Sequence, residues 1–283
     1  MPSFPIVDTH VHLWNLERLR YPWLEAVPSL NRSHLIEDYH QACGSVAVAK
    51  IIFVQCECEP AQSQHEVDWV TELERVHSQI RGIVAAAPLE TGNAAEPALA
   101  RLAANPLVKG VRRLIQSEPD IDFCLRPDFV RGVSLLSRYN LGFDLCIHHP
   151  QLARATELVR RCPDVRFILD HIGKPDIKAG LLEPWRTQLR ALAALPNVWC
   201  KVSGLVTEAD HQKWTRADLQ PYVDHVLACF GFDRVMFGSD WPVAAQAADY
   251  LCWVSTLDQA LQGSSPDELR RLYVRNAEAC YRI

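Results

Sequence analysis

The sequence predicts one domain over residues 1–283 with the fold of a (β/α)8 TIM barrel. Eight short segments rich in β-branched and aromatic residues recur along the 283 residues, and segments of helical periodicity separate them. The length suits this fold, which typically needs about 250 residues. The main alternative, an open doubly wound sheet, is disfavoured because no glycine-rich phosphate-binding turn follows an early strand.

The eight predicted strands follow one another at intervals that leave room for a helix after each. Strands that alternate with helices form parallel sheets, and eight parallel strands are the number that closes a barrel. In chain order, the predicted strands are residues 6–12, 50–56, 80–87, 109–115, 142–148, 166–171, 198–203 and 234–238.

Two of the intervening segments show clear helical signals. Residues 65–78 carry apolar side chains at helical spacing, which predicts one buried stripe. Ser265 is the predicted N-cap of a helix over residues 266–281. The stripe consists of Val67, Val70, Leu73 and Val76.

Two longer irregular segments are predicted to form the rim of the barrel. Residues 13–33 follow the first strand, and residues 205–216 follow the seventh. Long loops in a compact domain usually act as lids or rims of a site. Their notable side chains are Trp14, Tyr21, Pro22 and Trp23 in the first loop, and Glu208, His211 and Trp214 in the second.

The composition favours an enzyme that acts on small molecules. Apolar residues make up 48% and charged residues 22%, and the net charge is −5 with scattered basic residues, so no basic face for nucleic acid is expected. No segment approaches the roughly 20 apolar residues of a membrane span, so no membrane association is expected. Residues 1–5 lack the basic and apolar regions of a signal peptide, and we expect a cytoplasmic protein.

The ten cysteines are expected to be reduced. Cys146, Cys200 and Cys229 lie inside apolar segments, where a thiol packs as a small hydrophobic group. Cys56 and Cys58 form the one pair with metal-ligand spacing, but no second pair completes a zinc ribbon. We interpret them as packing residues.

Polar side chains gather at the predicted strand ends, where barrels of this type build their active sites. His10 and His12 are two residues apart in a strand, so with Asp8 they are expected to face one cavity. Asp170 and Asp240 have an alternative role as helix caps, but convergence of several strand ends favours a site. The other strand-end candidates are Gln55, Glu57, Arg112, Arg113, Asp144, His148, His149, His171, Lys201 and Ser203.

Four motifs in barrel order carry a family resemblance. They are residues 7–12 (VDTHVH), 169–175 (LDHIGKP), 201–205 (KVSGL) and 237–242 (FGSDWP). Together they resemble the amidohydrolase superfamily and, within it, the sugar-lactonase branch of fuconolactonase-like and rhamnonolactonase-like hydrolases. The resemblance extends over nearly the whole chain.

The resemblance implies roles for the strand-end residues. Asp240 matches the superfamily aspartate that takes a proton from the hydrolytic water or holds that water beside a metal. His10, His12 and His171 match its metal-binding or electrophilic positions. Arg112 is expected to polarise the lactone carbonyl and stabilise the oxyanion.

The fourth strand departs from the two-metal pattern of the superfamily. Members with two metals bridge them with a lysine or glutamate from this strand, where this chain has Arg112. A guanidinium beside two metal ions is electrostatically unfavourable, which leaves one divalent ion or none. The expected zinc ligands are His10, His12, His171 and Asp240, with His148 as an alternative third imidazole. We expect a site that binds one zinc ion and hydrolysis that survives its removal.

The implied substrate is an aldonolactone, L-fuconolactone or a related deoxy-sugar or pentonic lactone, opened to its acid. Aromatic side chains of the rim would pack on the sugar ring, and charged side chains would bind its hydroxyls. These residues are Trp14, Trp23, Trp214, Glu57, Glu208, Lys201 and one of His148 and His149. The alternatives are a metal-dependent decarboxylase of an unsaturated or aromatic acid, which chelation would inactivate, and a catalytically silent binding protein. The oligomeric state stays open.

Overall fold

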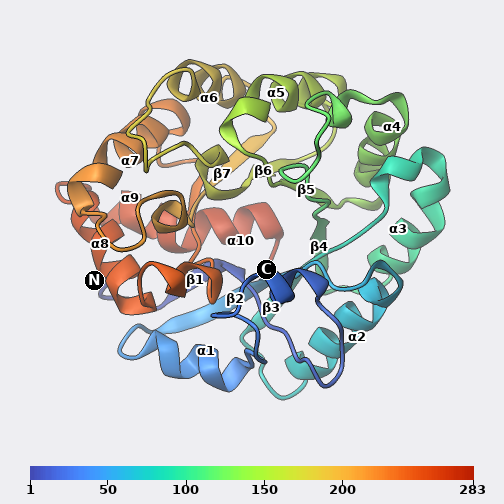
Figure 1. The fold of residues 1–283 in the computed structure, drawn as a ribbon, viewed down its shortest axis with the longest axis horizontal. Coiled ribbons are helices and arrows are strands. Elements are labelled where there is room, and N and C mark those ends of the chain that lie inside the picture. Colours follow the sequence, from blue (N-terminus) through green and yellow to red (C-terminus); the bar gives the residue numbers. More distant parts are fainter.

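Eight parallel strands form the centre of the molecule in a computed structural model that describes residues 1–283. Each strand is hydrogen-bonded to the next in the order β1 to β8. The helices surround the strands (Figure 1). The strands are β1 (Ile6–Val11), β2 (Val48–Val54), β3 (Ile80–Ala85), β4 (Val108–Val111), β5 (Gly142–Leu145), β6 (Phe167–Leu169), β7 (Val198–Val202) and β8 (Val235–Phe237).

The barrel closes between its first and last strands. The main-chain N–H of His12 donates to the carbonyl of Trp241 at 2.8 Å, and that of Asp240 donates to the carbonyl of His10 at 2.9 Å. A parallel bridge between Val11 and Trp241 accompanies these bonds. The predicted (β/α)8 barrel is therefore confirmed. Its strands end earlier than expected because the residues at the carboxyl ends leave the sheet to form the mouth.

The chain forms ten α-helices around the strands and at one end of the barrel. They are α1 (Ile36–Cys43), α2 (Ser63–Glu74), α3 (Glu96–Ala103), α4 (Pro127–Leu135), α5 (Leu152–Arg161), α6 (Trp185–Ala193), α7 (Arg216–Phe230), α8 (Tyr250–Ala260), α9 (Pro266–Arg270) and α10 (Asn276–Tyr281). None of them combines the length and apolar character that a membrane crossing requires.

Two predicted helical details have different outcomes. Ser265 caps α9 as expected, since its hydroxyl accepts a hydrogen bond from the N–H of Glu268 at 3.3 Å. The expected apolar stripe of residues 65–78 is wrong at its end: Val76 is 78% exposed because α2 ends at Glu74.

One end of the barrel is filled by the last helix. A single π-helical turn, η10 (Arg271–Arg275), joins α9 to α10. Cys280 and Tyr281 of α10 pack against Val7 and Met236 in the barrel interior. Figure 1 shows α10 near the centre of the ring of helices. The other end of the barrel, where the strands end, is thus left for a site.

The loop after β1 covers part of this open end. It contains the short 3-10 helix η1 (Pro22–Ala26) and is tied back by two main-chain bonds between Trp14 and His34, at 3.0 and 2.9 Å. Trp14 is fully buried, and its indole N–H donates to the carbonyl of Arg32 at 2.6 Å. These bonds hold the loop against the barrel as an ordered rim. All ten cysteines of the molecule are free thiols.

Candidate active site

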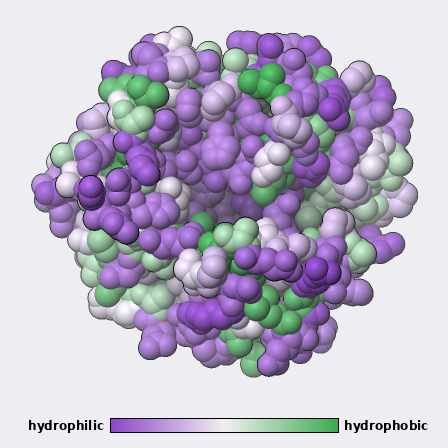
Figure 2. Space-filling view, in the orientation of Figure 1, coloured by the Kyte–Doolittle hydropathy of each residue, from purple (hydrophilic) through white to green (hydrophobic).

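A cavity of about 280 Å³ opens at the carboxyl ends of the strands. Its walls come from many strand ends and from the loop after β1. The molecular surface is hollowed near the centre of the face in Figure 2, and mainly hydrophilic side chains surround the hollow. The lining residues are His12, Trp14, Trp23, Cys56, Glu57, Arg112, Leu114, Gln116, Ser117, Cys146, His171, Lys174, Thr207, Asp240 and Val243.

Three imidazoles and one carboxylate form the floor of the cavity. We call His10, His12, His171 and Asp240 the histidine–aspartate cluster. One carboxylate oxygen of Asp240, Oδ1, lies 3.4 Å from Nε2 of His12, 3.7 Å from Nε2 of His10 and 3.9 Å from Nε2 of His171. The four side chains come from three separate strand ends, so their convergence is a product of the fold.

Two hydrogen bonds orient the outer imidazoles of the cluster. Nδ1 of His12 lies 2.8 Å from the carbonyl oxygen of Val54, and a carbonyl only accepts, so this nitrogen carries the proton. Nδ1 of His171 lies 2.9 Å from the hydroxyl of Ser203. Nε2 of neutral His12 is therefore an unprotonated acceptor that faces the cluster.

Burial sets the charge of the cluster. Burial lowers the pKa of His171 to about 4 and lowers that of His10 well below its usual value. For Asp240, burial would raise the pKa, but the neighbouring His171 and His12 hold it below the usual value for aspartate. The cluster at neutral pH consequently contains neutral imidazoles and an ionised Asp240 carboxylate.

Arg112 supplies the positive charge of the cavity floor. Its Nη2 donates to the carbonyl of Gln55 at 2.6 Å, and its Nη1 lies 3.3 Å from Nε2 of His10 and 3.5 Å from Oδ2 of Asp170. Arg112 is only 5% exposed, so bulk water screens the charge of its guanidinium weakly where that group faces the cavity. A carbonyl oxygen placed beside it would be strongly polarised.

The backbone is tightly constrained where His171 and Asp240 leave their strands. Both residues have left-handed backbone conformations, with φ of +51° and +59°. Gly204, at φ +63°, lies directly against them: a Cβ at this position would be 2.5 Å from Nδ1 of His171 and 3.0 Å from Oδ2 of Asp240. Only glycine leaves room for these two side chains.

A set of buried charges lies beneath the cluster. We call Asp144, Asp170 and Lys201 the buried ion-pair network. Nζ of Lys201 lies 2.5 Å from Oδ2 of Asp144 and 3.1 Å from Oδ1 of Asp170, and all three side chains are 0% exposed. The expectation that Lys201 binds substrate hydroxyls is wrong, because its ammonium group lies in the barrel interior away from the cavity.

The prediction that Asp8 faces the cavity with His10 and His12 is also wrong. Its Oδ2 accepts hydrogen bonds from the hydroxyls of Tyr39 and Tyr250, at 3.0 Å each, so the carboxylate faces α1 and α8 outside the barrel. The register of β1 against β2 shifts between Asp8 and Val11. Such an irregularity breaks the alternation of faces and separates Asp8 from His10 and His12.

Seven of the predicted site residues line the cavity: His12, Trp14, Trp23, Glu57, Arg112, His171 and Asp240. His10 lies directly beneath them, 3.1 Å from His12 between their Nε2 atoms. Like Lys201, the predicted residues His148 and Trp214 do not line the cavity. His148 is exposed at the end of β5, as its neighbour His149 is in part, and Trp214 packs on the rim with its N–H bonded to the carbonyl of Ala247 at 3.0 Å.

The cavity also contains residues that the sequence analysis did not assign. Lys174, Gln116 and Thr207 each present a polar side chain to it. Lys174 falls within the motif of residues 169–175, so the sequence motif could have indicated it as a site residue. Gln116 comes from an irregular loop and Thr207 from the short 3-10 helix η8 (Leu205–Glu208), and neither segment is long enough for a periodic pattern to indicate direction.

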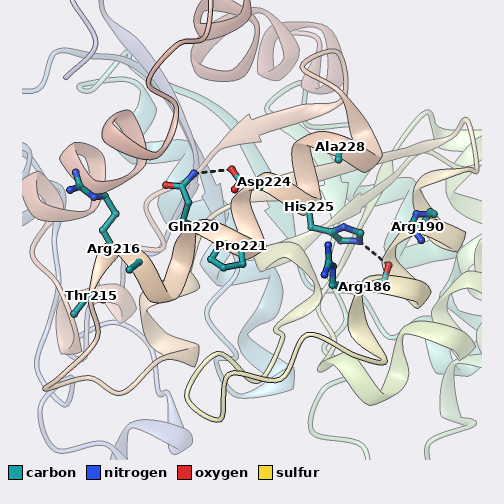
Figure 3. Close-up of a pocket in the computed structure, with 10 residues that line it drawn as sticks. Arg186, Arg190, Thr215, Arg216, Gln220, Pro221, Asp224, His225 and Ala228 are labelled. Carbon is teal, nitrogen blue, oxygen red and sulfur yellow. Dashed lines mark hydrogen bonds between the residues drawn. The ribbon is translucent and has the colours of Figure 1, made fainter.

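A larger groove of about 930 Å³ runs along α6 and α7, away from the strand ends. Figure 3 shows Arg216 and Thr215 at one end and Arg186 and Arg190 at the other, so the basic groups do not converge. His225 inside it is bonded to the carbonyl of Arg186 at 2.8 Å. The Asp224 carboxylate in the groove accepts a hydrogen bond from Gln220 at 2.8 Å, so this acid and His225 are each bonded to other groups, and the smaller cavity is the better candidate for the chemical site.

The fold and the cavity define a barrel hydrolase whose site combines neutral imidazoles, one carboxylate and a guanidinium. A family model described as amidohydrolase matches residues 7–283, and the chain belongs to this amidohydrolase family. An L-fucono-1,5-lactonase from Burkholderia multivorans is 33% identical, covering 98% of this chain and 96% of its own.

Two further comparisons agree with this membership. An L-rhamnono-gamma-lactonase from Scheffersomyces stipitis is 23% identical and matches over 100% of both chains. A crystal structure of an amidohydrolase from Burkholderia multivorans with bound zinc has a TM-score of 0.88 and 32% identity, covering 99% of this chain and 100% of that one. The resemblance to the amidohydrolase superfamily is thus confirmed, as is its lactonase branch by the names of these relatives.

Proposed function

We propose that this protein hydrolyses a sugar lactone to the free aldonic acid, with L-fuconolactone or a related deoxy-sugar or pentonic lactone as substrate. The observation that carries the proposal is the position of Asp240, within 4 Å of three imidazoles at the floor of a cavity that also contains Arg112. The full-length similarity to an L-fucono-1,5-lactonase supports the choice of substrate class.

In the proposed reaction, Asp240 is the general base. It is ionised and lines the cavity, so it can accept a proton from water as the water oxygen attacks the lactone carbonyl carbon. The C–O bond of the ring then breaks, and the leaving ring oxygen takes up this proton to become a hydroxyl group. Water and lactone together give the hydroxy acid, and no other reactant is needed.

Arg112 and the imidazoles would stabilise the oxyanion of this reaction. The guanidinium is held in place by the carbonyl of Gln55 and by Asp170, so little reorganisation is required when negative charge develops. Loss of one such donor typically costs about 10²- to 10³-fold in rate. Arg112 is therefore assigned to the carbonyl oxygen.

The histidine–aspartate cluster fits one divalent ion. The ligand atoms of His10, His12 and Asp240 lie within 4.8 Å of one another, and nitrogen and carboxylate donors suit zinc. A bound zinc ion would lower the pKa of a water molecule to about 7. We propose that these residues, with His171, hold at most one ion, and that Arg112 and Asp240 sustain hydrolysis without it.

The cavity walls suit a hydroxylated ring. Trp23 is fixed by donation of its indole N–H to the carbonyl of Cys56 at 2.8 Å, which leaves its aromatic surface for the apolar C–H face of a sugar. Glu57 accepts a hydrogen bond from Gln55 at 2.7 Å and has a second carboxylate oxygen for substrate hydroxyls. Both residues line the cavity.

A proton-release assay with a panel of sugar lactones tests the proposal, because each turnover yields one carboxylic acid. We expect turnover of L-fuconolactone or a related lactone, and we expect it to persist after treatment with a chelator. No turnover of any lactone in the panel would refute the assigned reaction. Turnover that chelation abolishes and zinc restores would refute only the metal-independent form of it.

A further inference from the structure

Lys174 presents an ammonium group with unused hydrogen-bond donors to the cavity. Its side chain is 15% exposed, and Nζ lies 3.8 Å from Oε1 of Glu208. This separation lets the two charges attract each other, but it exceeds the range of about 2.7–3.2 Å for an N–H···O hydrogen bond. An ammonium group has three N–H donors, and none of them donates to a protein acceptor here. Lys174 is therefore able to donate to a molecule bound in the cavity.

The backbone at Lys174 fixes where this side chain starts. Lys174 has a left-handed conformation, with φ of +46°. Its N–H donates to the carbonyl of His171 at 2.9 Å, and its own carbonyl accepts from the N–H of His149 at 3.2 Å. A residue with a Cβ keeps this conformation only where its surroundings hold it. The ammonium group is thus held at the wall of the cavity by the fold.

Glu208 is the anionic partner of Lys174, although it is not among the residues that line the cavity. It ends η8 after β7, and its main-chain carbonyl accepts from the N–H of Lys178 at 2.9 Å, which ties this segment to the loop after β6. Burial raises the pKa of the Glu208 carboxyl, and the charge of Lys174 acts in the opposite direction. An anionic ligand of Lys174 therefore has to compete with Glu208.

The proposed reaction creates a negative charge inside the cavity. A neutral lactone and water become an acid, which is ionised at neutral pH because carboxyl groups have pKa values of about 4. The ionised Asp240 carboxylate repels this new charge. Arg112 is already engaged by the carbonyl of Gln55 and by Asp170. Lys174 is the other cation among the lining residues, and its donors are free.

The two cations of the cavity lie near the same part of its wall. Cys146 lines the cavity, and burial raises the pKa of its thiol to about 11. The charges of Lys174 and Arg112 both oppose this rise, so both groups lie close to Cys146. A carboxylate formed beside Arg112 is consequently formed near Lys174 as well.

We propose that Lys174 binds the carboxylate of the product acid and that Glu208 competes with this carboxylate for Lys174. The inference rests on the proposed hydrolysis of a lactone. A neutral lactone does not displace Glu208, whereas the acid does, because hydrogen bonds between charged groups are the stronger ones. Competition by Glu208 lowers the affinity for the acid and so promotes its release. Lys174 is a product-binding residue, and Glu208 is a positioning residue that acts through it.

Calorimetric binding measurements with a charged and a neutral ligand test the role of Lys174. The charged ligands are sodium salts of aldonic acids, L-fuconate among them. The neutral ligand is 1,5-anhydro-L-fucitol, a cyclic ether that keeps the ring hydroxyls and has no carbonyl group. Lys174→Met should bind the acid about 10- to 100-fold more weakly than native protein, because hydrogen bonds to a charged group are lost. Its affinity for the neutral ether should stay within about twofold of the native value, a change of under half a tenfold step.

Lys178→Met is the matched control for this variant. It removes a positive charge from the same loop, but the Lys178 side chain is exposed and does not line the cavity. Its affinities for the acid and for the ether should both equal those of native protein. A loss of acid binding in this control would assign the effect to the overall charge of the loop.

A double-variant cycle tests the role of Glu208. Glu208→Gln should bind the acid about fivefold more tightly than native protein, because the competing charge is removed from a side chain of the same shape. The same substitution made in Lys174→Met should change acid affinity by less than about twofold, because Glu208 acts through Lys174. The double variant has no unpaired Glu208 charge, so it supplies the comparison if Lys174→Met alone folds poorly.

Several results would overturn the proposal. An equal loss of affinity for acid and ether in Lys174→Met would show that Lys174 binds ring hydroxyls. Unchanged acid affinity in Lys174→Met, or no acid binding by either native protein or Glu208→Gln, would remove the carboxylate site. Equal tightening by Glu208→Gln with and without Lys174 would remove the competition. None of these measurements requires turnover, so their failure is distinct from an absence of lactone hydrolysis.

Discussion

Gly204→Ala is the most direct test of the packing around the site. The Cβ of alanine would lie 2.5 Å from Nδ1 of His171 and 3.0 Å from Oδ2 of Asp240, at a φ of +63°. Left-handed backbone costs a residue with a Cβ about 1–2 kcal/mol. Overpacking adds about 1–3 kcal/mol. We therefore expect the free energy of unfolding to fall by about 2–5 kcal/mol.

The same substitution should also lower activity. Relief of the clash requires His171 or Asp240 to move, and a displacement of about 1 Å at reacting groups can cost about 10²-fold in rate. Chemical denaturation measures the loss of stability, and lactone hydrolysis measures kcat. Both losses are expected together, because one contact causes both.

Gly180→Ala provides the matched control. Gly180 has nearly the same conformation, with φ of +67°, but no atom lies within 4 Å of the position of its Cβ. Its substitution should lower the free energy of unfolding only by the cost of the left-handed backbone conformation, about 1–2 kcal/mol, and should leave kcat unchanged. If Gly204→Ala loses no more stability and activity than Gly180→Ala, the assigned contact with His171 and Asp240 is refuted.

Three further predictions follow from the cavity and its surroundings. Asp240→Asn should lower kcat by about 10²- to 10⁴-fold, and an active variant would reassign the base. Glu57→Gln should raise KM by about 10- to 100-fold with little change in kcat, because a charged hydrogen bond to a substrate hydroxyl is lost; an unchanged KM would place the hydroxyls elsewhere. Burial raises the pKa of Glu66 from 4.5 to about 8 in the folded protein, so the folded state holds a proton that the unfolded state releases. Between about pH 5 and 8 the free energy of unfolding should therefore fall by about 1.4 kcal/mol per pH unit relative to Glu66→Gln. Chemical denaturation at several pH values measures this, and the same pH dependence of the unfolding free energy in both proteins would contradict the prediction.

The sequence predicts which strands carry the site, because parallel strands of a closed barrel must end at the same mouth. His12, Arg112, His171 and Asp240 follow directly from this rule and line one cavity. Alternation along a strand predicts the face of a side chain but not its depth in the barrel. Lys201 faces inward as the alternation requires, yet it lies one layer below the cavity.

Other errors come from places where the regular pattern is interrupted. The register shift in β1 directs Asp8 toward Tyr39 and Tyr250, and a single-residue irregularity of this kind leaves no trace in residue types. His148 and Trp214 follow strands through irregular turns, where direction depends on tertiary packing. Sequence periodicity thus predicts the strand-end residues better than those contributed by loops.

The hydrogen bond between Tyr281 and Asp144 has a consequence for the order of assembly during synthesis. The two residues are 137 positions apart in the chain, and Tyr281 belongs to the helix that fills the barrel end opposite the cavity. A growing chain that already contains all eight strands still lacks this helix, so Asp144 and Lys201 remain open to water. The electrostatic environment beneath His10 is completed only when α10 docks, and a polypeptide cut before α10 should be inactive despite retaining every cavity residue.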